Sequence, residues 1–290
     1  MIQTEHRGKG SGQGKIILCG EHAVVYGYPA VALGLSCTTT VTLSAKTGPT
    51  ELESGEAHET LATVIQQQLP AEGLRIGIES DVPIGKGMGS SAALAVALVR
   101  ARASVQCAPL SEAQTFEQSL AIERLFHGNP SGLDNTVAAL GGVLRFEKGP
   151  PPTVTRLPMP NWSLVILDAG SAPATKEMVQ QVALGFPANN SVIEQIGALS
   201  VAIAAHLEDE RFVASRMNEN QALLVELGVS SAPLDAMVAW ARKHGAIGAK
   251  LSGAGGGGMV IALSPQPQEL LKEAEQAGIS ALHTRPWIPT

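Results

Sequence analysis

Aromatic residues, cysteines and long hydrophobic runs are all scarce in this 290-residue chain. Phe, Trp and Tyr make up 3% of it, so a core must be built from Ala, Val, Leu and Ile within a hydrophobic content of 44%. The three cysteines, Cys19, Cys37 and Cys107, are odd in number and form no CxxC pair. This argues against a disulfide framework or a zinc site, and it favours a reducing cytoplasm.

Excess positive charge and membrane-directed segments are also lacking. The formal net charge is −6, so a broad basic surface for nucleic acid is not expected, although a local basic site for a small anion is allowed. No run of about 18 uncharged apolar residues occurs, so no transmembrane helix is expected. The first residues, MIQTEHRGKGSGQGK, lack the apolar stretch of a secretory signal, which is therefore not expected either.

Short apolar runs bounded by Gly or Pro predict strands, and longer periodic stretches predict helices. The predicted strands span residues 16–19, 38–44, 74–79, 142–146, 164–168 and 259–263. The predicted helices span 111–127, which starts with a Ser111/Gln114 capping box, 192–207 and 268–277. Interleaved strands and helices indicate an α/β or α+β protein. Five prolines within 148–160 predict a domain junction, with domains over 1–158 and 159–290.

The first of three notable segments, residues 14–27, is an apolar strand between charged residues. Lys15 precedes the strand, and Glu21 and His22 follow it. Taken alone, a strand that ends in a solvated polar turn explains these charges equally well.

The second segment, residues 83–93, reads PIGKGMGSSAA and leads into an Ala-rich helix. Ser90 and Ser91 stand at the helix start, where unpaired N–H groups and the helix dipole attract phosphate. Glycines let the backbone wrap an anion, and a serine hydroxyl can bind Mg²⁺. The spacing is not the GxxxxGK[ST] pattern of P-loop proteins. A serine-capped helix after a flexible loop is the structural alternative.

The third segment, residues 250–258, reads KLSGAGGGG and formally matches GxGxxG. A dinucleotide site needs a strand before this motif and a helix after it. Residues 259–263 predict a strand instead, so a nicotinamide or flavin site is disfavoured. Close approach of the backbone to a ligand is the simplest reason for five glycines in six residues.

Two carboxylates add acid chemistry between the second and third segments. Glu123 lies in the last turn of the predicted 111–127 helix, where it opposes the helix dipole unless a cation lies beside it. Asp134 follows Ser131, a predicted N-cap, and so belongs to the first turn of a new helix. A capping carboxylate is the alternative for Asp134, and His127 is expected to end or pack its helix.

In this order, the segments resemble the motifs of the GHMP kinase superfamily over nearly the whole chain. GKIILCGEHAVVYGYPA, ERLFHGNPSGLDN and Ala174-Thr175-Lys176 are most similar to the mevalonate kinases within it. The phosphate loop departs from the usual pattern at Lys86 and Met88, and the chain is short for this family. The resemblance implies an α+β, two-domain GHMP kinase fold, with an S5-domain-2-like N-terminal and a ferredoxin-like C-terminal domain and the active site in the cleft between them.

The resemblance also implies a role for each matching residue. Asp134 would be the catalytic base, and Lys15 would stabilise the transferred phosphoryl group. The residues implied to bind ATP are Ser80, Gly85, Lys86, Gly87, Met88, Gly89, Ser90 and Ser91. Ser91 and Glu123 would hold Mg²⁺. The residues implied to line the substrate and γ-phosphate region are Glu21, His22, Thr175, Ser252, Gly253 and Ala254.

The expected activity is therefore ATP- and Mg²⁺-dependent phosphorylation of the 5-hydroxyl of mevalonate, in the cytoplasm. The partner would be a small molecule and not nucleic acid or membrane, and the resemblance allows a homodimer without requiring one. Three alternatives stay open at this point: a GHMP kinase for another acceptor, such as phosphomevalonate or a sugar; a non-catalytic GHMP-fold binding protein; and a dinucleotide oxidoreductase. The presence of Lys15, Ser91, Glu123 and Asp134 together disfavours the non-catalytic alternative.

Overall fold

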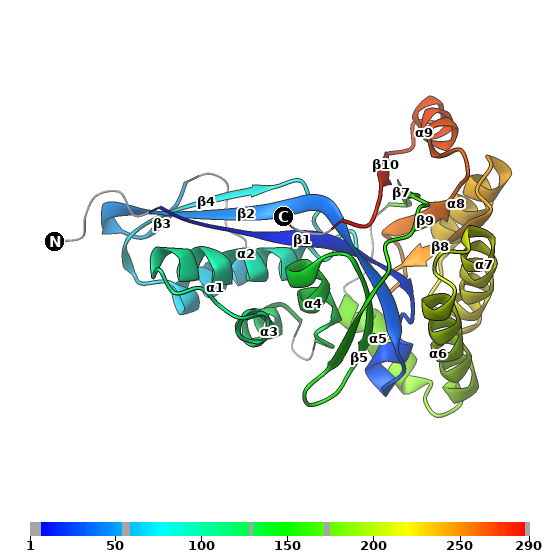
Figure 1. Cartoon of the computed structure of the whole chain (residues 1–290), viewed down its shortest axis with the longest axis horizontal. Helices are drawn as coiled ribbons and strands as arrows, with labels where there is room; N and C mark the ends of the chain where they lie inside the picture. The colour runs from blue at the N-terminus through cyan, green and yellow to red at the C-terminus, as the bar shows by residue number, and fades with distance from the viewer. Residues whose placement is uncertain (1–6, 54–58, 128–129, 171–174, 288–290) are drawn as a thin grey trace. The chain divides into compact units, whose positions relative to one another are not determined.

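The computed structural model describes residues 7–53, 59–127, 130–170 and 175–287, except for the side chains of Glu59, Thr175 and Lys176. Helices and two sheets alternate along the chain, which confirms the α+β class (Figure 1). The chain divides into two compact units: unit 1 comprises residues 1–14, 37–83 and 89–140, and unit 2 comprises 15–36, 84–88 and 141–290. The domain limits at residues 158 and 159 remain a prediction.

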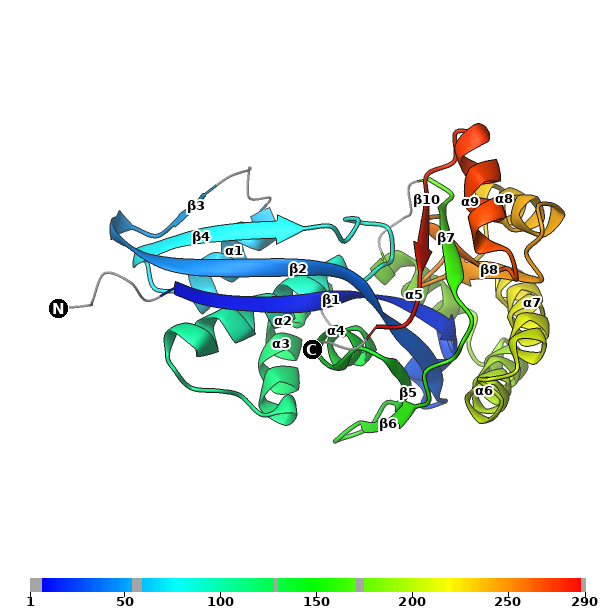
Figure 2. The ribbon, with the colours of Figure 1, turned by 45° about the horizontal axis from the view of Figure 1, so that its top comes forward.

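Unit 1 packs helices on one face of a sheet (Figure 2). Its strands are the first part of β1 (Arg7–Cys19), the second part of β2 (Ala30–Pro49), β3 (Glu51–Leu52) and β4 (Glu72–Ser80). Its helices are α1 (Glu59–Gln68), α2 (Ser90–Val105), α3 (Glu112–His127) and α4 (Leu133–Leu140). Strands β2 and β4 pair antiparallel, with Val41 opposite Ile78. Buried Val41, Leu43 and Ile76 meet the alanines of α2, and this contact forms the core.

Alternate glycines let strand β1 lie directly on helix α2. Successive residues of a strand face opposite sides, so Gly10 and Gly12 share one face. A Cβ atom on Gly12 would lie 2.1 Å from the carbonyl oxygen of Ala93, and one on Gly10 would lie 2.3 Å from the backbone nitrogen of Ala101. Only glycine permits this approach, which fixes the position of the helix that begins with Ser90.

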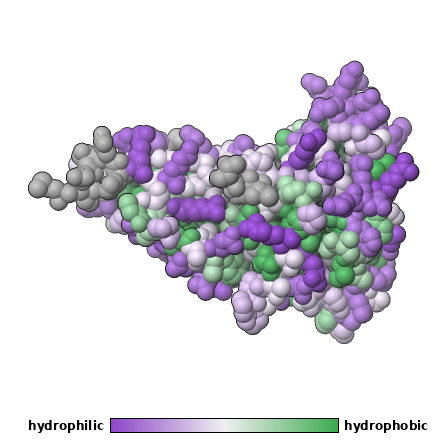
Figure 3. All heavy atoms as spheres, viewed as in Figure 1, coloured by the Kyte–Doolittle hydropathy of each residue, from purple (hydrophilic) through white to green (hydrophobic). Residues whose placement is uncertain are grey.

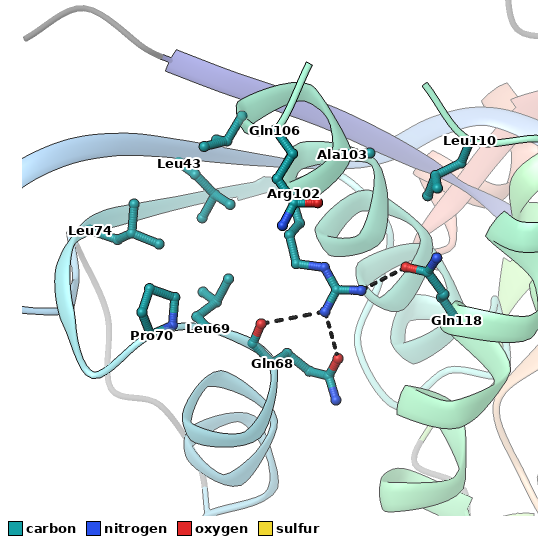
Figure 4. Close-up of a pocket in the computed structure, with 11 residues that line it drawn as sticks. Leu43, Gln68, Leu69, Pro70, Leu74, Arg102, Ala103, Gln106, Leu110 and Gln118 are labelled. Atoms are coloured by element: carbon teal, nitrogen blue, oxygen red, sulfur yellow. Dashed lines mark hydrogen bonds between the residues drawn. The ribbon is translucent and has the colours of Figure 1, made fainter. Parts of the chain in front are cut away.

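A pocket of about 460 Å³ lies between the ends of α1 and α2 in unit 1 (Figure 4). Leu69 and Leu74 contribute to its apolar wall. Arg102 donates to Gln68 Oε1 at 3.1 Å and to Gln118 Oε1 at 2.6 Å. The guanidinium therefore ties the end of α2 to both α1 and α3.

Unit 2 builds a second sheet in the order β10-β7-β9-β8, with every described pairing antiparallel. Its strands after residue 140 are β5 (Val143–Glu147), β6 (Thr153–Leu157), β7 (Leu164–Asp168), β8 (Gly248–Ser252), β9 (Met259–Leu263) and β10 (Ala281–Thr284). Its helices are η1 (Ala23–Tyr26), α5 (Thr175–Leu184), α6 (Asn190–Ala205), α7 (Glu210–Glu226), α8 (Ala232–Lys243) and α9 (Pro267–Gln276). Strands β5 and β6 pair with each other and extend the first part of β2.

Side chains of α7 satisfy the open edge of β8. An edge strand presents unpaired N–H and C=O groups that need partners when they are buried. Asn218 donates to the carbonyl oxygen of Ile247 at 2.9 Å and accepts from the N–H of Ala249 at 3.1 Å. Gln221 accepts from the N–H of Leu251 at 2.9 Å. The strand that leads into the third glycine-rich segment is thus held along its whole length.

The surface of unit 2 is polar where its outer helix lies. Figure 3 shows hydrophilic residues over α9, where Gln268, Glu269, Lys272 and Glu273 are exposed. Within the part of the chain that the structure describes, no helix is both long and apolar enough to cross a membrane.

All the predicted strands and helices have counterparts, and the differences are elements that the sequence analysis did not predict, among them the helices α1, α5, α7 and α8. The predicted strands 164–168 and 259–263 are confirmed residue for residue as β7 and β9, and the three predicted helices correspond to α3, α6 and α9. The predicted capping box is present. The N–H of Gln114 donates to Ser111 Oγ at 3.2 Å, and the N–H of Ser111 donates to Gln114 Oε1 at 2.9 Å. The sequence analysis missed β3, β6, β8 and β10, and β6 lies inside the proline-rich segment 148–160.

Candidate active site

The first part of the second motif, Ile84–Met88, lies in unit 2 and is called the phosphate loop below. Gly85 and Gly87 have φ values of 71° and 78°, which residues with a Cβ atom rarely adopt. The N–H of Lys15 donates to Met88 O at 2.9 Å, and Lys15 Nζ donates to Gly87 O at 3.2 Å. Buried Lys15 therefore fixes the loop and brings a positive charge to it.

The third motif lies against the same loop. The carbonyl oxygen of Ser252 would be 3.4 Å from a Cβ atom on Gly87, and Gly87 is likewise within 4 Å of a Cβ on Gly253. Ser252 Oγ accepts from the N–H of Ile17 at 3.0 Å and donates to Ile17 O at 3.1 Å. These contacts bring three distant segments together, with the backbone of the third motif close to the backbone of the phosphate loop.

His22 joins the first motif to the third by its ring. Its Nε2 lies 2.9 Å from Ala254 O, which can only accept, so Nε2 carries the proton. Burial lowers the pKa of His22, partly offset by the Ala254 carbonyl and by Glu21. The residue has a φ of 61°, uncommon for any residue but glycine. The turn therefore contains a neutral imidazole on a residue whose backbone conformation is constrained.

Glu21 forms a buried ion pair with Lys250. Both side chains are 0% exposed, and the lysine donates to Glu21 Oε1 and also to the carbonyl oxygen of Leu251. Asn220 of α7 donates to Glu21 Oε2 at 3.1 Å. The pair connects the turn that holds His22 to the strand that leads into the third motif.

The start of α2 in unit 1 holds the predicted metal ligands. Gly89 is in the left-handed conformation before the helix, and Ser90 begins it. Ser91 Oγ donates to Glu123 Oε1 at 2.8 Å, and His127 Nε2 lies 3.1 Å from the same hydroxyl. Glu123 is 1% exposed, so a hydroxyl and a buried carboxylate meet at a helix N-terminus.

Asp134 lies in the first turn of α4, as the sequence predicts. Ser131 Oγ accepts from the N–H of Leu133, the first residue of the helix, at 3.2 Å, whereas Gly132 takes the cap position because its carbonyl oxygen accepts from the N–H of Thr136 at 3.1 Å. At the other end, Arg100 donates to Ala139 O at 2.8 Å and to Ser11 O at 2.7 Å. The arginine complements the helix dipole and anchors the helix that carries Asp134.

Ser80 ends strand β4, away from any of these clusters within unit 1. Its hydroxyl lies 2.8 Å from Thr39 Oγ1 and accepts from the N–H of Val82 at 3.2 Å. Thr175 is the first residue of α5, and its side chain lies outside the described part of the structure, as does all of Ala174.

Each unit thus collects its own set of predicted residues. Unit 2 brings Lys15, Glu21, His22, the phosphate loop and Ser252–Ala254 into one network. Unit 1 brings Ser91 and Glu123 together. The sequence analysis missed Lys250, Asp168 and the contact of His127 with Ser91. Lys250 opens the third motif, and Asp168 ends a correctly predicted strand, so their positions were visible although their partners were not.

Two known protein families match parts of the chain. The GHMP kinases N terminal domain family matches residues 57–142, and the GHMP kinases C terminal family matches residues 201–280. The two matches fall on either side of the proline-rich segment.

Mevalonate kinases are among the relatives of the chain. That of Thermococcus onnurineus is 36% identical over an alignment that covers 89% of each chain. That of Pyrococcus abyssi is 34% identical over an alignment that covers 95% of this chain and 94% of the relative. The crystal structure of L. major mevalonate kinase in complex with R-mevalonate has a TM-score of 0.85 at 25% identity and covers 99% of both chains. The chain belongs to the mevalonate kinase family of the GHMP kinases.

Proposed function

We propose that the protein transfers the γ-phosphoryl group of ATP to the 5-hydroxyl of mevalonate and so forms 5-phosphomevalonate. The observation that carries this proposal is the meeting of three motifs in unit 2, where Lys15 and the Ser252-Gly253 backbone lie against the phosphate loop. Family membership supports a kinase, and the choice of mevalonate rests on what the relatives are named for.

The proposed phosphate-binding role depends on backbone and side-chain donors. Phosphoryl transfer needs alignment of the reactants and neutralisation of charge on the phosphoryl oxygens. The loop glycines would let backbone N–H groups approach a phosphate, and Ser90 and Ser91 would add the positive end of α2. Lys15 adds a full charge beside the loop, because its Nζ is only 3.2 Å from Gly87 O. Ser80 is proposed as a further nucleotide contact.

Ser91 and Glu123 fit a magnesium ion, since hydroxyl and carboxylate oxygens are ligands that Mg²⁺ accepts and theirs lie 2.8 Å apart. Bound there, the ion would neutralise charge on the nucleotide phosphates. These two side chains would hold it from separate helices, α2 and α3, whose mutual position Arg102 also fixes through Gln118.

Asp134 is proposed to orient the acceptor hydroxyl and to take its proton. In a loose transition state the proton leaves late, so a weak base is sufficient. Glu21, His22, Thr175, Ser252, Gly253 and Ala254 are proposed to shape the substrate and γ-phosphate region. Because the Glu21 carboxylate is buried on Lys250, it would contribute through the backbone that it holds.

The test is acceptor-dependent ADP release by the purified chain with ATP and Mg²⁺. We expect turnover with mevalonate and not with phosphomevalonate or galactose. Asp134→Asn should lower kcat by at least a hundredfold at an unchanged melting temperature, and Lys15→Met should lower kcat more than it raises KM. Preference for phosphomevalonate or galactose would assign the protein another GHMP kinase activity. Nucleotide binding without turnover on any acceptor would favour a non-catalytic role.

Two further properties belong to the proposal. A cytoplasmic location is inferred from the soluble substrates, and cell fractionation tests it. A homodimer remains a prediction, which light scattering of the purified chain decides.

A further inference from the structure

The phosphate loop carries a lysine whose charge is held by an acidic residue of the second sheet. Lys86 Nζ lies 2.9 Å from Asp168 Oδ1, and the two side chains are 26% and 24% exposed. Lys86 stands between Gly85 and Gly87, whose positive φ values turn the backbone sharply on both sides of it. The ion pair therefore connects the middle of the phosphate loop to the end of strand β7.

Asp168 is the fixed member of this pair. Its N–H donates to Ser280 O at 2.9 Å, and its Oδ1 accepts from the N–H of Gly170 at 2.8 Å. The same oxygen that receives Lys86 thus also closes the turn after β7. Lysine, in contrast, carries its charge on a flexible four-carbon stem. When the pair opens, Lys86 is the side chain that moves.

The surroundings make this pair exchangeable. Ion pairs that water can reach are weak, because solvent screens the attraction and can take up both charges. A nucleotide phosphate offers several charged oxygens, and hydrogen bonds between ionised groups are among the strongest in proteins. The backbone of this loop is held independently by Lys15 through Met88 O and Gly87 O, so the loop keeps its place when Lys86 leaves Asp168.

We propose that Lys86 passes from Asp168 to a phosphate of ATP when the nucleotide binds, and that Asp168 is a positioning residue that holds the lysine over the loop beforehand. This inference rests on the proposed ATP-binding function of the loop. It gives the Lys86 side chain a phosphate-contacting role separate from the backbone donors around it. It also makes Asp168 a competitor of the nucleotide for the same charge.

The competition predicts opposite effects for the two partners. Lys86→Met removes a charged contact that forms only with the nucleotide, so the Kd of ATP should rise roughly tenfold. Asp168→Asn removes the competing acceptor, so the Kd of ATP should stay the same or fall. The double variant should bind ATP as Lys86→Met does. A purely structural pair would give both single variants the same loss, because each breaks the same contact.

The experiment is calorimetric titration of the full chain with ATP and Mg²⁺ in the absence of any acceptor. Lys86→Arg should retain most of the wild-type affinity. Lys46→Met is the matched control, because it removes a lysine from another ion pair, with Glu51 at 2.7 Å, outside the three motifs. It should leave the Kd unchanged, and all variants should keep the wild-type melting temperature within a few degrees.

The inference is overturned if Lys86→Met binds ATP as the wild type does, or if Asp168→Asn weakens binding as Lys86→Met does. Because no acceptor is present, these outcomes are distinct from failure of the proposed reaction. A wild-type chain that binds no ATP would refute the proposed function together with this inference. One that binds ATP but does not phosphorylate mevalonate would refute only the acceptor.

Discussion

The buried pair of Glu21 and Lys250 gives a stability prediction that can be worked out in detail. Both side chains are 0% exposed, and Glu21 has a further partner in Asn220. Glu21→Gln keeps the shape and the Asn220 contact but leaves the ammonium group of Lys250 without its countercharge. Removing one member of a buried pair costs about 3–5 kcal/mol, since the remaining charge must be desolvated alone. For a chain of this size, that loss lowers the melting temperature by on the order of 10 °C.

The double variant Glu21→Gln/Lys250→Met distinguishes the energy of the ion pair from the separate contributions of its two side chains. It removes both charges and leaves side chains of similar volume, and such replacements often change the free energy of unfolding little. We therefore expect the double variant to be more stable than Glu21→Gln alone. The difference from additivity measures the coupling between the two side chains.

The measurement is the free energy of unfolding by denaturant, with melting temperature as a second readout. Glu219→Gln is the matched control, because it breaks an ion pair with Arg216 in which the two side chains are 48% and 33% exposed. It should cost less than about 1 kcal/mol. A cost of Glu21→Gln as small as that of the control would refute the reasoning, and so would a double variant as unstable as the sum of the two single ones.

Two further predictions concern the backbone around the site. Gly12→Ala places a Cβ atom 2.1 Å from Ala93 O and should cost about 1–3 kcal/mol in chemical denaturation. Gly77→Ala should be near neutral, because its Cβ atom would meet the flexible end of the Glu53 side chain at 3.1 Å and Thr42 Cβ at an ordinary 3.8 Å; equal costs would contradict the close contact of β1 with α2. Burial lowers the pKa of His22 below its ordinary 6.5, so the unfolded chain binds the proton more readily. Stability should therefore be complete above about pH 6.5 and fall as the pH drops toward the folded-state value, by at most about 1.4 kcal/mol per pH unit, and this slope should be reduced in His22→Gln.

Local sequence signals predicted the elements whose cause is local. Strands β7 and β9 are apolar runs with clear limits, and helix α3 starts with a capping box whose two hydrogen bonds form as expected. The start of α4 near Asp134 was likewise visible from Ser131, whose hydroxyl accepts from the N–H of Leu133, the first residue of the helix.

Elements that depend on distant partners were missed or shortened. Strand β1 begins at Arg7, nine residues before the predicted start at residue 16, because its alternate glycines carry no apolar signal and only make sense against α2. Strand β8 contains Lys250, a residue that looks solvent-exposed until Glu21, far away in sequence, neutralises it. Strand β6 is a short edge strand between prolines, which is where a sheet tolerates them.

The candidate site shows the same division. The resemblance to the GHMP kinases singled out Lys15, Ser91 and Glu123, and the structure brings the last two within hydrogen-bond distance. Spacing could not reveal that Lys86 pairs with Asp168 or that His127 reaches Ser91, because these contacts are set by the packing of separate elements.

Two lysines of unit 2, Lys250 and Lys86, differ in burial, and this difference determines what each can do. Lys250 and Glu21 are fully buried, and parting them would leave both charges where nothing can solvate them, so their pair holds the backbone that leads to Ser252. Lys86 and Asp168 form a pair of the same chemical kind, but water reaches both side chains. The first pair should therefore affect stability more than ATP affinity. The second should determine ATP affinity with little effect on stability, and a reversal of these effects between the two pairs would contradict burial as the deciding variable.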